Sequence, residues 1–187
     1  MNGSVSPDAV VGEGLLQIED CLDADGGVVL PSGVNLISLI ERNIATVADA
    51  IAYRYLDFTG PDGGRAVEMT WRELGIRMKA IGAHVQRAAS TGDRVAVLAP
   101  QGLDYVAGFY AAIRAGTIAV PLFAPELPGH TERLDTALRD AQPAAVLTTA
   151  AARGSVEAFL DTRIDKRQRP EVIVIDKIPD AAADDFD

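Results

Sequence analysis

The second half of the chain alternates short apolar runs with amphipathic segments. The apolar runs, which have the length of buried strands, cover residues 94–99, 117–122, 144–148 and 171–176. The amphipathic segments, which place apolar side chains at helical spacing, cover residues 103–115, 131–141 and 156–160. An alternation of strand and helix is typical of parallel strands joined by right-handed crossovers. The pattern therefore predicts an α/β fold in which helices flank a parallel sheet.

The first half predicts an N-terminal helix and a β-hairpin ahead of that sheet. Apolar residues recur at helical spacing from Leu36 to Ile44, and Asn35 is placed to cap this helix. Residues 51–58 are rich in aromatic side chains, residues 59–64 are turn formers, and residues 65–69 can return as a second strand.

A capping box opens a longer helix directly after the hairpin. The Thr70 side chain can accept a backbone hydrogen bond from the first turn, and Glu73 can reach back to Thr70. The helix places an apolar stripe on one face: Leu74, Met78, Ile81 and Val85. We expect this stripe to face the core, and we expect His84 to pack at its edge rather than bind a ligand.

These patterns divide the chain into three parts. Residues 1–33 are rich in Gly, Asp and Ser and are expected to be an irregular lead-in. Residues 34–178 carry the folded unit. Residues 179–187 combine four aspartates with small alanines, and their composition predicts a flexible acidic linker or a cut end.

Charge and cysteine content narrow the function. The formal net charge is −10, which argues against nucleic acids and anionic membrane surfaces as partners. Cys21 is the single cysteine, so no internal disulfide can form, and a reducing cytoplasm is expected. The apolar runs fall well short of the roughly 18 residues of a transmembrane helix.

Two motifs that would indicate a catalytic site are missing from these 187 residues. The sequence contains neither a G-x-x-x-x-G-K-[ST] phosphate loop nor a G-x-S-x-G elbow. The two histidines, His84 and His130, lie far apart, and we expect His130 to shape the loop and helix start around it. Asp135 and Arg139 are spaced for a solvated ion pair on a helix face.

The residues alone therefore predict a soluble α/β domain of open function. In such folds ligands lie past the carboxyl ends of the strands, here residues 99–101 and 123–125. A non-catalytic binding or interaction module is one alternative. A flavodoxin-like nucleotide binder is disfavoured, because no loop after a predicted strand is rich in Gly, Ser or Thr.

Four segments in order resemble the adenylate-forming superfamily. They are 68–74 (EMTWREL), 92–98 (GDRVAVL), 112–122 (AIRAGTIAVPL) and 141–149 (AQPAAVLTT). Three further stretches resemble its fatty acyl-AMP ligases: 53–58 (YRYLDF), 100–105 (PQGLDY) and 121–130 (PLFAPELPGH). An acyl-CoA ligase is the alternative within the superfamily.

This resemblance implies that the chain is the N-terminal part of an enzyme that activates a long-chain fatty acid with ATP and Mg²⁺. The acyl-AMP would pass to an acyl carrier protein of a polyketide synthase. The family's phosphate loop and catalytic lysine would follow residue 179, and Lys166 and Lys177 match neither. The resemblance therefore carries no catalytic, cofactor-binding or metal-binding residue onto this chain, leaves the substrate-binding residues open, and implies that this piece is inactive alone.

Overall fold

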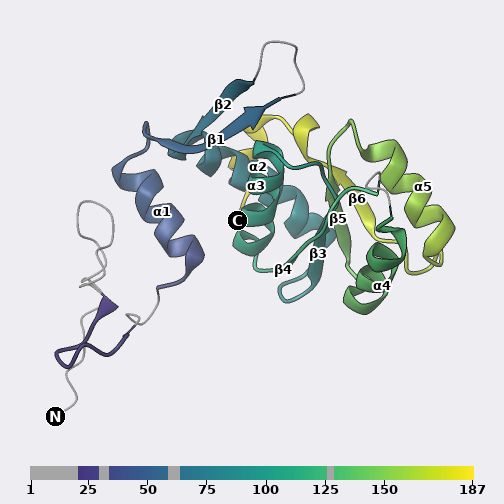
Figure 1. The fold of residues 1–187 in the computed structure, drawn as a ribbon, viewed down its shortest axis with the longest axis horizontal. Coiled ribbons are helices and arrows are strands. Elements are labelled where there is room, and N and C mark those ends of the chain that lie inside the picture. Colours follow the sequence, from purple (N-terminus) through teal and green to yellow (C-terminus); the bar gives the residue numbers. More distant parts are fainter. Residues whose placement is uncertain (1–20, 30–33, 59–63, 126–128) are drawn as a thin grey trace.

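The computed structural model describes residues 21–29, 34–58, 64–125 and 129–187 (Figure 1). Its helices and strands, in chain order, are α1 (Leu36–Thr46), β1 (Ile51–Asp57), β2 (Arg65–Thr70), α2 (Trp71–Ala88), β3 (Arg94–Val97), α3 (Leu103–Arg114), β4 (Ile118–Pro121), α4 (Thr131–Ala141), β5 (Ala145–Thr148), α5 (Arg153–Arg163) and β6 (Glu171–Val174). Two 3₁₀ segments follow, η3 (Ile175–Lys177) and η4 (Asp180–Asp185). The predicted order of helix, hairpin, helix and alternating strands and helices is confirmed.

The main sheet has four parallel strands in the order β4-β3-β5-β6. The chain moves from β3 outward to β4, then crosses back to β5 and β6. Because right-handed crossovers in opposite directions fall on opposite faces, α3 covers one face and α4 and α5 cover the other. Figure 1 shows α2 beside α3 on the first face, with α4 and α5 beyond the strands.

Alternate side chains of the strands fill two cores. Val95 and Val97 pack with α2 and α3 in the larger core, whereas Ala96 and Leu98 pack with α4 and α5 in the smaller one. All four side chains are fully buried. The runs therefore read as continuously apolar, because each strand is covered on both faces.

Two predicted helix caps form as expected. The Asn35 side chain accepts from Ser38 N, and the Ser38 hydroxyl accepts from Asn35 N. Thr70 Oγ1 accepts from Glu73 N at 3.2 Å, and Thr70 N donates to Glu73 Oε2 at 2.8 Å. These reciprocal bonds satisfy backbone donors that the first helical turn leaves free.

Some element boundaries differ from the expected ones. β3 ends at Val97 rather than at residue 99, and β6 ends at Val174 rather than at residue 176. α5 runs over Arg153–Arg163 rather than over 156–160, and an Arg153–Glu157 ion pair lies in its first turns. Apolar periodicity detects buried positions, so it misses the polar ends of a helix and overruns strands that end in buried loops.

Residues 179–187 are not the flexible linker that their composition predicts. η4 packs along α2, and Arg77 and Arg87 of α2 pair with Asp180 and Asp185 at 2.9 and 2.8 Å. Arg77 also donates to the carbonyl oxygens of residues 175 and 178. Two of the four aspartates that suggest a solvated linker are thus ion-paired to arginines about a hundred positions away.

An aromatic contact completes the docking of this segment. The Phe186 ring lies against Gly82 of α2, where it leaves no room for a Cβ atom. The Arg114 guanidinium lies 4.9 Å from the centre of the same ring. Arg114 is ion-paired with Glu41 of α1, so one arginine links α1, α3 and the C-terminal segment.

The expected lead-in is described in part. Residues 21–29 contain an isolated antiparallel bridge between Leu22 and Val28, and the rest of 1–33 lies outside the described residues. Residues 59–63 of the expected turn and 126–128 of the 121–130 stretch lie outside them as well. Among the helices that the structure describes, none has the length and hydropathy needed to cross a bilayer.

Candidate functional site

A groove of about 960 Å³ lies at the carboxyl end of the main sheet. Its lining comes from the chain after β3 and the start of α3 (99–103, Tyr105 and Val106), from the chain after β4 (122–124) and from β1 (53–55). We call this the carboxyl-end groove. It forms where β3 and β4 stop and their continuations separate, since the chain after β3 turns into α3.

The sequence predicted two of the three walls of this groove. Residues 99–101 and 123–124 were expected to lie past the strand ends, and the structure brings them together, while Pro125 lies outside the lining. The β1 wall was not expected. No local signal places a hairpin strand against loops some fifty residues later, because that contact depends on how the hairpin packs on α3.

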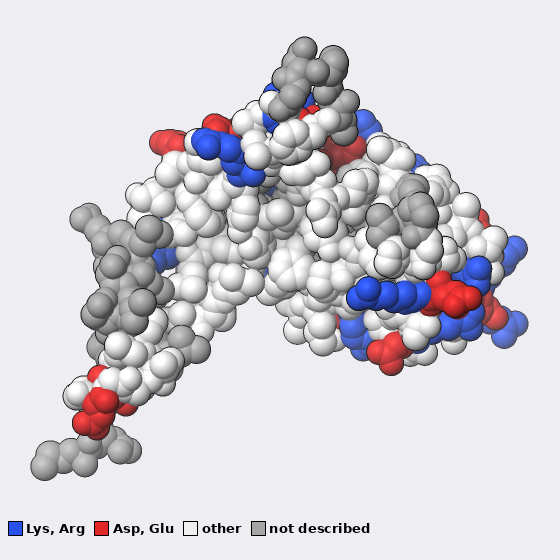
Figure 2. Space-filling view, viewed as in Figure 1, with Lys and Arg blue, Asp and Glu red and all other residues white. Residues whose placement is uncertain are grey.

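The groove is nearly free of charge. Among its described lining residues Arg54 is the charged one, and its Nε donates to Glu68 Oε1 of β2 at 2.6 Å. Figure 2 shows Lys, Arg, Asp and Glu gathered over α4 and α5 and beside the hairpin, whereas the middle of that face, over α3 and β4, is almost uncharged. An apolar ligand is therefore better suited to the groove than a highly charged one.

Two hydrogen bonds made by tyrosine hydroxyls help to fix the walls of the groove. Tyr105 donates to the Leu122 carbonyl oxygen at 2.8 Å, and burial raises the pKa of Tyr105. The Tyr53 and Tyr110 hydroxyl oxygens lie 2.7 Å apart. Burial, and then the bond to Tyr110, raise the pKa of Tyr53. Both walls are thus held by neutral hydrogen bonds to α3.

Asp104 in the first turn of α3 is an acidic group with a shifted pKa. Burial is the main cause and raises it, Arg77 lowers it, and Asp176 raises it further. Asp104 is half-buried and is not among the residues that line the groove. The geometry gives this carboxylate no contact with a ligand in the groove.

A second hollow, of about 470 Å³, lies at the amino end of the sheet between the C-terminal ends of α4 and α5. Its buried leucines, Leu138 and Leu160, belong to the smaller core. Gln142 ends α4 in the left-handed conformation with φ 45°, which strains a residue other than glycine. We call this the amino-end hollow.

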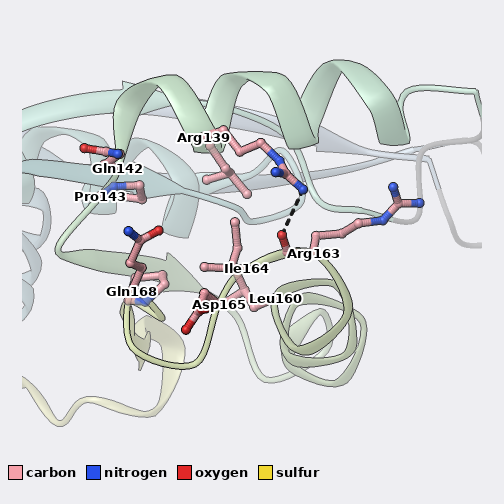
Figure 3. Close-up of a pocket in the computed structure, with 10 residues that line it drawn as sticks. Arg139, Gln142, Pro143, Leu160, Arg163, Ile164, Asp165 and Gln168 are labelled. Atoms are coloured by element: carbon pink, nitrogen blue, oxygen red, sulfur yellow. Dashed lines mark hydrogen bonds between the residues drawn. The ribbon is translucent and has the colours of Figure 1, made fainter.

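Charged and amide groups surround the amino-end hollow. Figure 3 shows the Arg139 guanidinium above Ile164, with a hydrogen bond of 3.2 Å from Nη2 to the Arg163 carbonyl oxygen. The Asp165 carboxylate and the Arg163 side chain extend toward opposite sides of this view (Figure 3). Arg139 Nε also binds Asp135 at 3.0 Å, which confirms the expected helix-face ion pair. The Arg139 guanidinium at this rim is therefore already paired.

The histidines and the cysteine take no part in either hollow. His84 Nδ1 lies 3.1 Å from the Ala80 carbonyl oxygen one turn earlier, in the helix-edge position expected of it. His130 directly precedes α4, and its ring meets Phe123 edge-on with centroids 5.5 Å apart. Cys21 is a free thiol. In the described part of the chain, no three His, Cys, Asp or Glu side chains gather as a metal site would require.

Comparison with known proteins identifies the family. Residues 40–187 match the family model of the AMP-binding enzymes. The chain is 42% identical over 159 residues to the long-chain fatty acid–AMP ligase FadD32 of Mycolicibacterium smegmatis. The matched stretch covers 85% of this chain and 25% of that protein. It is 37% identical over 139 residues to the long-chain fatty acid–AMP ligase FadD26 of Mycobacterium tuberculosis. This matched stretch covers 74% of this chain and 24% of that protein.

The fold comparison agrees with the sequence comparison. The fatty acid AMP ligase of Legionella pneumophila superposes with a TM-score of 0.69 at 22% identity, over 81% of this chain and 25% of that one. The chain thus spans about a quarter of the length of the curated relatives it matches. It belongs to the AMP-binding enzymes, and its relatives within that family include the long-chain fatty acid–AMP ligases.

Proposed function

We propose that these residues are the N-terminal part of an enzyme that joins a long-chain fatty acid to ATP. The observation that carries the proposal is the 42% identity to a long-chain fatty acid–AMP ligase over 85% of the chain. In this reaction a carboxylate oxygen of the fatty acid attacks the α-phosphorus of ATP. The bond from that phosphorus to the bridging oxygen breaks, which gives acyl-AMP and pyrophosphate.

The carboxyl-end groove is the part of this chain that suits the alkyl portion of such a substrate. Its lining is nearly uncharged, and burial of a methylene group is worth roughly 0.8 kcal/mol. The amino-end hollow is smaller and has a charged rim. We therefore propose that the carboxyl-end groove forms one wall of the acyl site in the whole enzyme.

The described residues do not provide an evident site for ATP or Mg²⁺. No cluster of metal-binding side chains lies among them, and the groove lacks an unpaired cation in its described lining. We propose that the rest of the enzyme holds the nucleotide and that this chain supplies scaffold rather than catalytic groups. When bound, Mg²⁺ would neutralise charge on the phosphate oxygens.

The acceptor of the acyl group and the cellular site are further proposals. We propose that an acyl carrier protein of a polyketide synthase takes the acyl group on its thiol. Transfer to coenzyme A is the alternative. The single cysteine supports a reducing compartment, and we propose the cytoplasm.

The test measures pyrophosphate and acyl-AMP formed from hexadecanoate, ATP and Mg²⁺. It compares the 187-residue chain with the longer chain encoded by the whole gene. Activity in the longer chain alone is expected. Activity in the 187 residues would show that the catalytic groups lie within them, and inactivity of both would favour a binding module without catalysis. Adding either the carrier protein or coenzyme A then identifies the acceptor.

A further inference from the structure

A side-chain hydrogen bond from Tyr105 holds the backbone of the groove wall that follows β4. Leu122 N donates to the Val97 carbonyl oxygen at 3.2 Å, which extends the bonding between β4 and β3 by one residue. The Leu122 carbonyl oxygen accepts from the Tyr105 hydroxyl at 2.8 Å. Phe123 and Ala124 follow directly and line the groove. A hydroxyl from the first turns of α3 therefore helps to position this wall, beside the Leu122–Val97 backbone bond and the contact of Phe123 with His130.

A similar bond joins the same two elements at their other ends. Thr117, just before β4, donates through its hydroxyl to the Ala112 carbonyl oxygen near the end of α3 at 2.7 Å. Thr117 is buried and lies outside the groove lining. α3 and β4 are thus tied by a hydroxyl at each end, and the Tyr105 bond is the one that meets the groove.

The opposite wall is held from the same helix. The Tyr53 hydroxyl of β1 lies 2.7 Å from the Tyr110 hydroxyl of α3. The Tyr53 ring also meets Trp71 of α2 edge-on, with centroids 6.2 Å apart. Because α3 anchors both walls, the Tyr105 bond on one side and the Tyr53 contacts on the other constrain the width of the groove at residues 122–124.

We infer that Tyr105 is a specificity-determining residue for the length and width of the acyl chain. The inference rests on the proposed function and extends it. An alkyl chain in the groove meets Leu122, Phe123 and Ala124 as a wall that the Tyr105 hydroxyl keeps in place. Without that hydroxyl the wall can move outward, so bulkier chains gain relative to the preferred one.

The experiment compares Tyr105→Phe with Thr117→Val in the longer chain encoded by the whole gene. Each variant deletes one hydroxyl bond between α3 and β4, but only the first bond holds the groove wall. The values of kcat/KM for adenylation are measured with octanoate, dodecanoate, hexadecanoate and a branched long-chain acid. Tyr105→Phe should shift the ratio between the bulkiest and the preferred substrate by about tenfold toward the bulkier, and Thr117→Val should leave it unchanged.

A third variant narrows the groove from the same wall. Ala124→Leu adds volume at a half-buried lining position and should shift the preference toward shorter chains. It keeps the inference testable if Tyr105→Phe does not fold, and an unchanged preference in Ala124→Leu would then overturn it.

The remaining outcomes are equally decisive. Equal shifts in Tyr105→Phe and Thr117→Val would show general loosening of α3 against β4 and would overturn the specificity role. So would unchanged ratios in Tyr105→Phe. If the wild-type enzyme adenylates fatty acids and the variants keep its substrate preference, this inference alone is refuted. A wild-type enzyme that adenylates none refutes the proposed function as well.

Discussion

The two hollows lie at opposite ends of one parallel sheet and differ in chemistry. The carboxyl-end groove is larger, nearly uncharged and bounded by loops and a hairpin strand. The amino-end hollow has a rim of arginine and glutamine over buried leucines of the smaller core. The same sheet therefore offers an apolar groove at one end and a smaller, polar-rimmed hollow at the other.

Topology explains this difference. At the carboxyl end, β3 leads into α3 on one face, whereas the chain from β4 leads to α4 on the other face, so their continuations separate and open a crevice. At the amino end, α4 returns to β5 within three residues, 142–144. A short return keeps the helix end close to the sheet and leaves only a dent above packed side chains.

Truncating a buried leucine beneath the amino-end hollow should have the largest effect on stability. Leu160 is fully buried there, and Leu160→Ala should lower the free energy of unfolding by about 2–5 kcal/mol. Leu103→Ala, at a half-buried position in the carboxyl-end groove, should cost less. Urea denaturation measures both. A larger loss for Leu103→Ala would mean that the groove, not the hollow, lies over the tighter packing.

Removing the Tyr105 hydroxyl should have the next largest effect. Tyr105→Phe leaves the Leu122 carbonyl oxygen without this donor and should cost about 1–3 kcal/mol of unfolding free energy. Thr117→Val at the other ends of α3 and β4 should cost a similar amount. Urea denaturation of the two variants compares the contributions of the two hydrogen bonds to the free energy of unfolding. A loss in Thr117→Val alone would show that the Tyr105 bond adds no stability.

The Tyr53–Tyr110 contact should make stability fall at alkaline pH. The folded state raises the pKa of Tyr53, so above the unfolded value of about 10 the unfolded chain loses its proton first. Stability from this group is therefore fully present below that pH and is lost as the pH rises further. Tyr53→Phe should flatten the decline in thermal unfolding temperature, at a cost near neutrality of about 0.5–1.5 kcal/mol. An equally steep decline in the variant would contradict this assignment.

The ion pair at the amino-end rim should have the smallest effect. Asp135→Asn removes the partner of Arg139, whose side chain is 62% exposed, and should cost less than about 0.5 kcal/mol. The loss should vanish at high salt, because ions screen exposed pairs. Thermal unfolding at low and high ionic strength tests both statements, and a salt-independent loss would indicate a role for the carboxylate beyond this pair.

Much of the fold follows from local sequence signals. Apolar runs mark each strand because side chains on both faces of a parallel strand are buried, as Val95 and Ala96 show. Asn35 and Thr70 cap their helices through bonds to residues three positions away, so the motif contains its own partners. Two of the three walls of the groove follow as well, since the ends of predicted parallel strands indicate where ligands lie.

The contacts that build the site are long-range, and the sequence does not reveal them. Tyr53 reaches Tyr110 across 57 positions, and two aspartates of 180–185 reach α2 across about a hundred. The composition of residues 179–187 predicted a solvated segment, because aspartate lies at the surface unless a basic side chain pairs with it.

The sequence by itself determined the elements, the parallel pairing of the later strands and the family, because these depend on periodicity and on motifs within a few residues of each other. The tertiary structure decided which end of the sheet opens into a neutral groove, which tyrosine hydroxyls hold its walls, and where the C-terminal segment docks. Those features depend on how separate elements pack, and packing brings together side chains that no local pattern pairs.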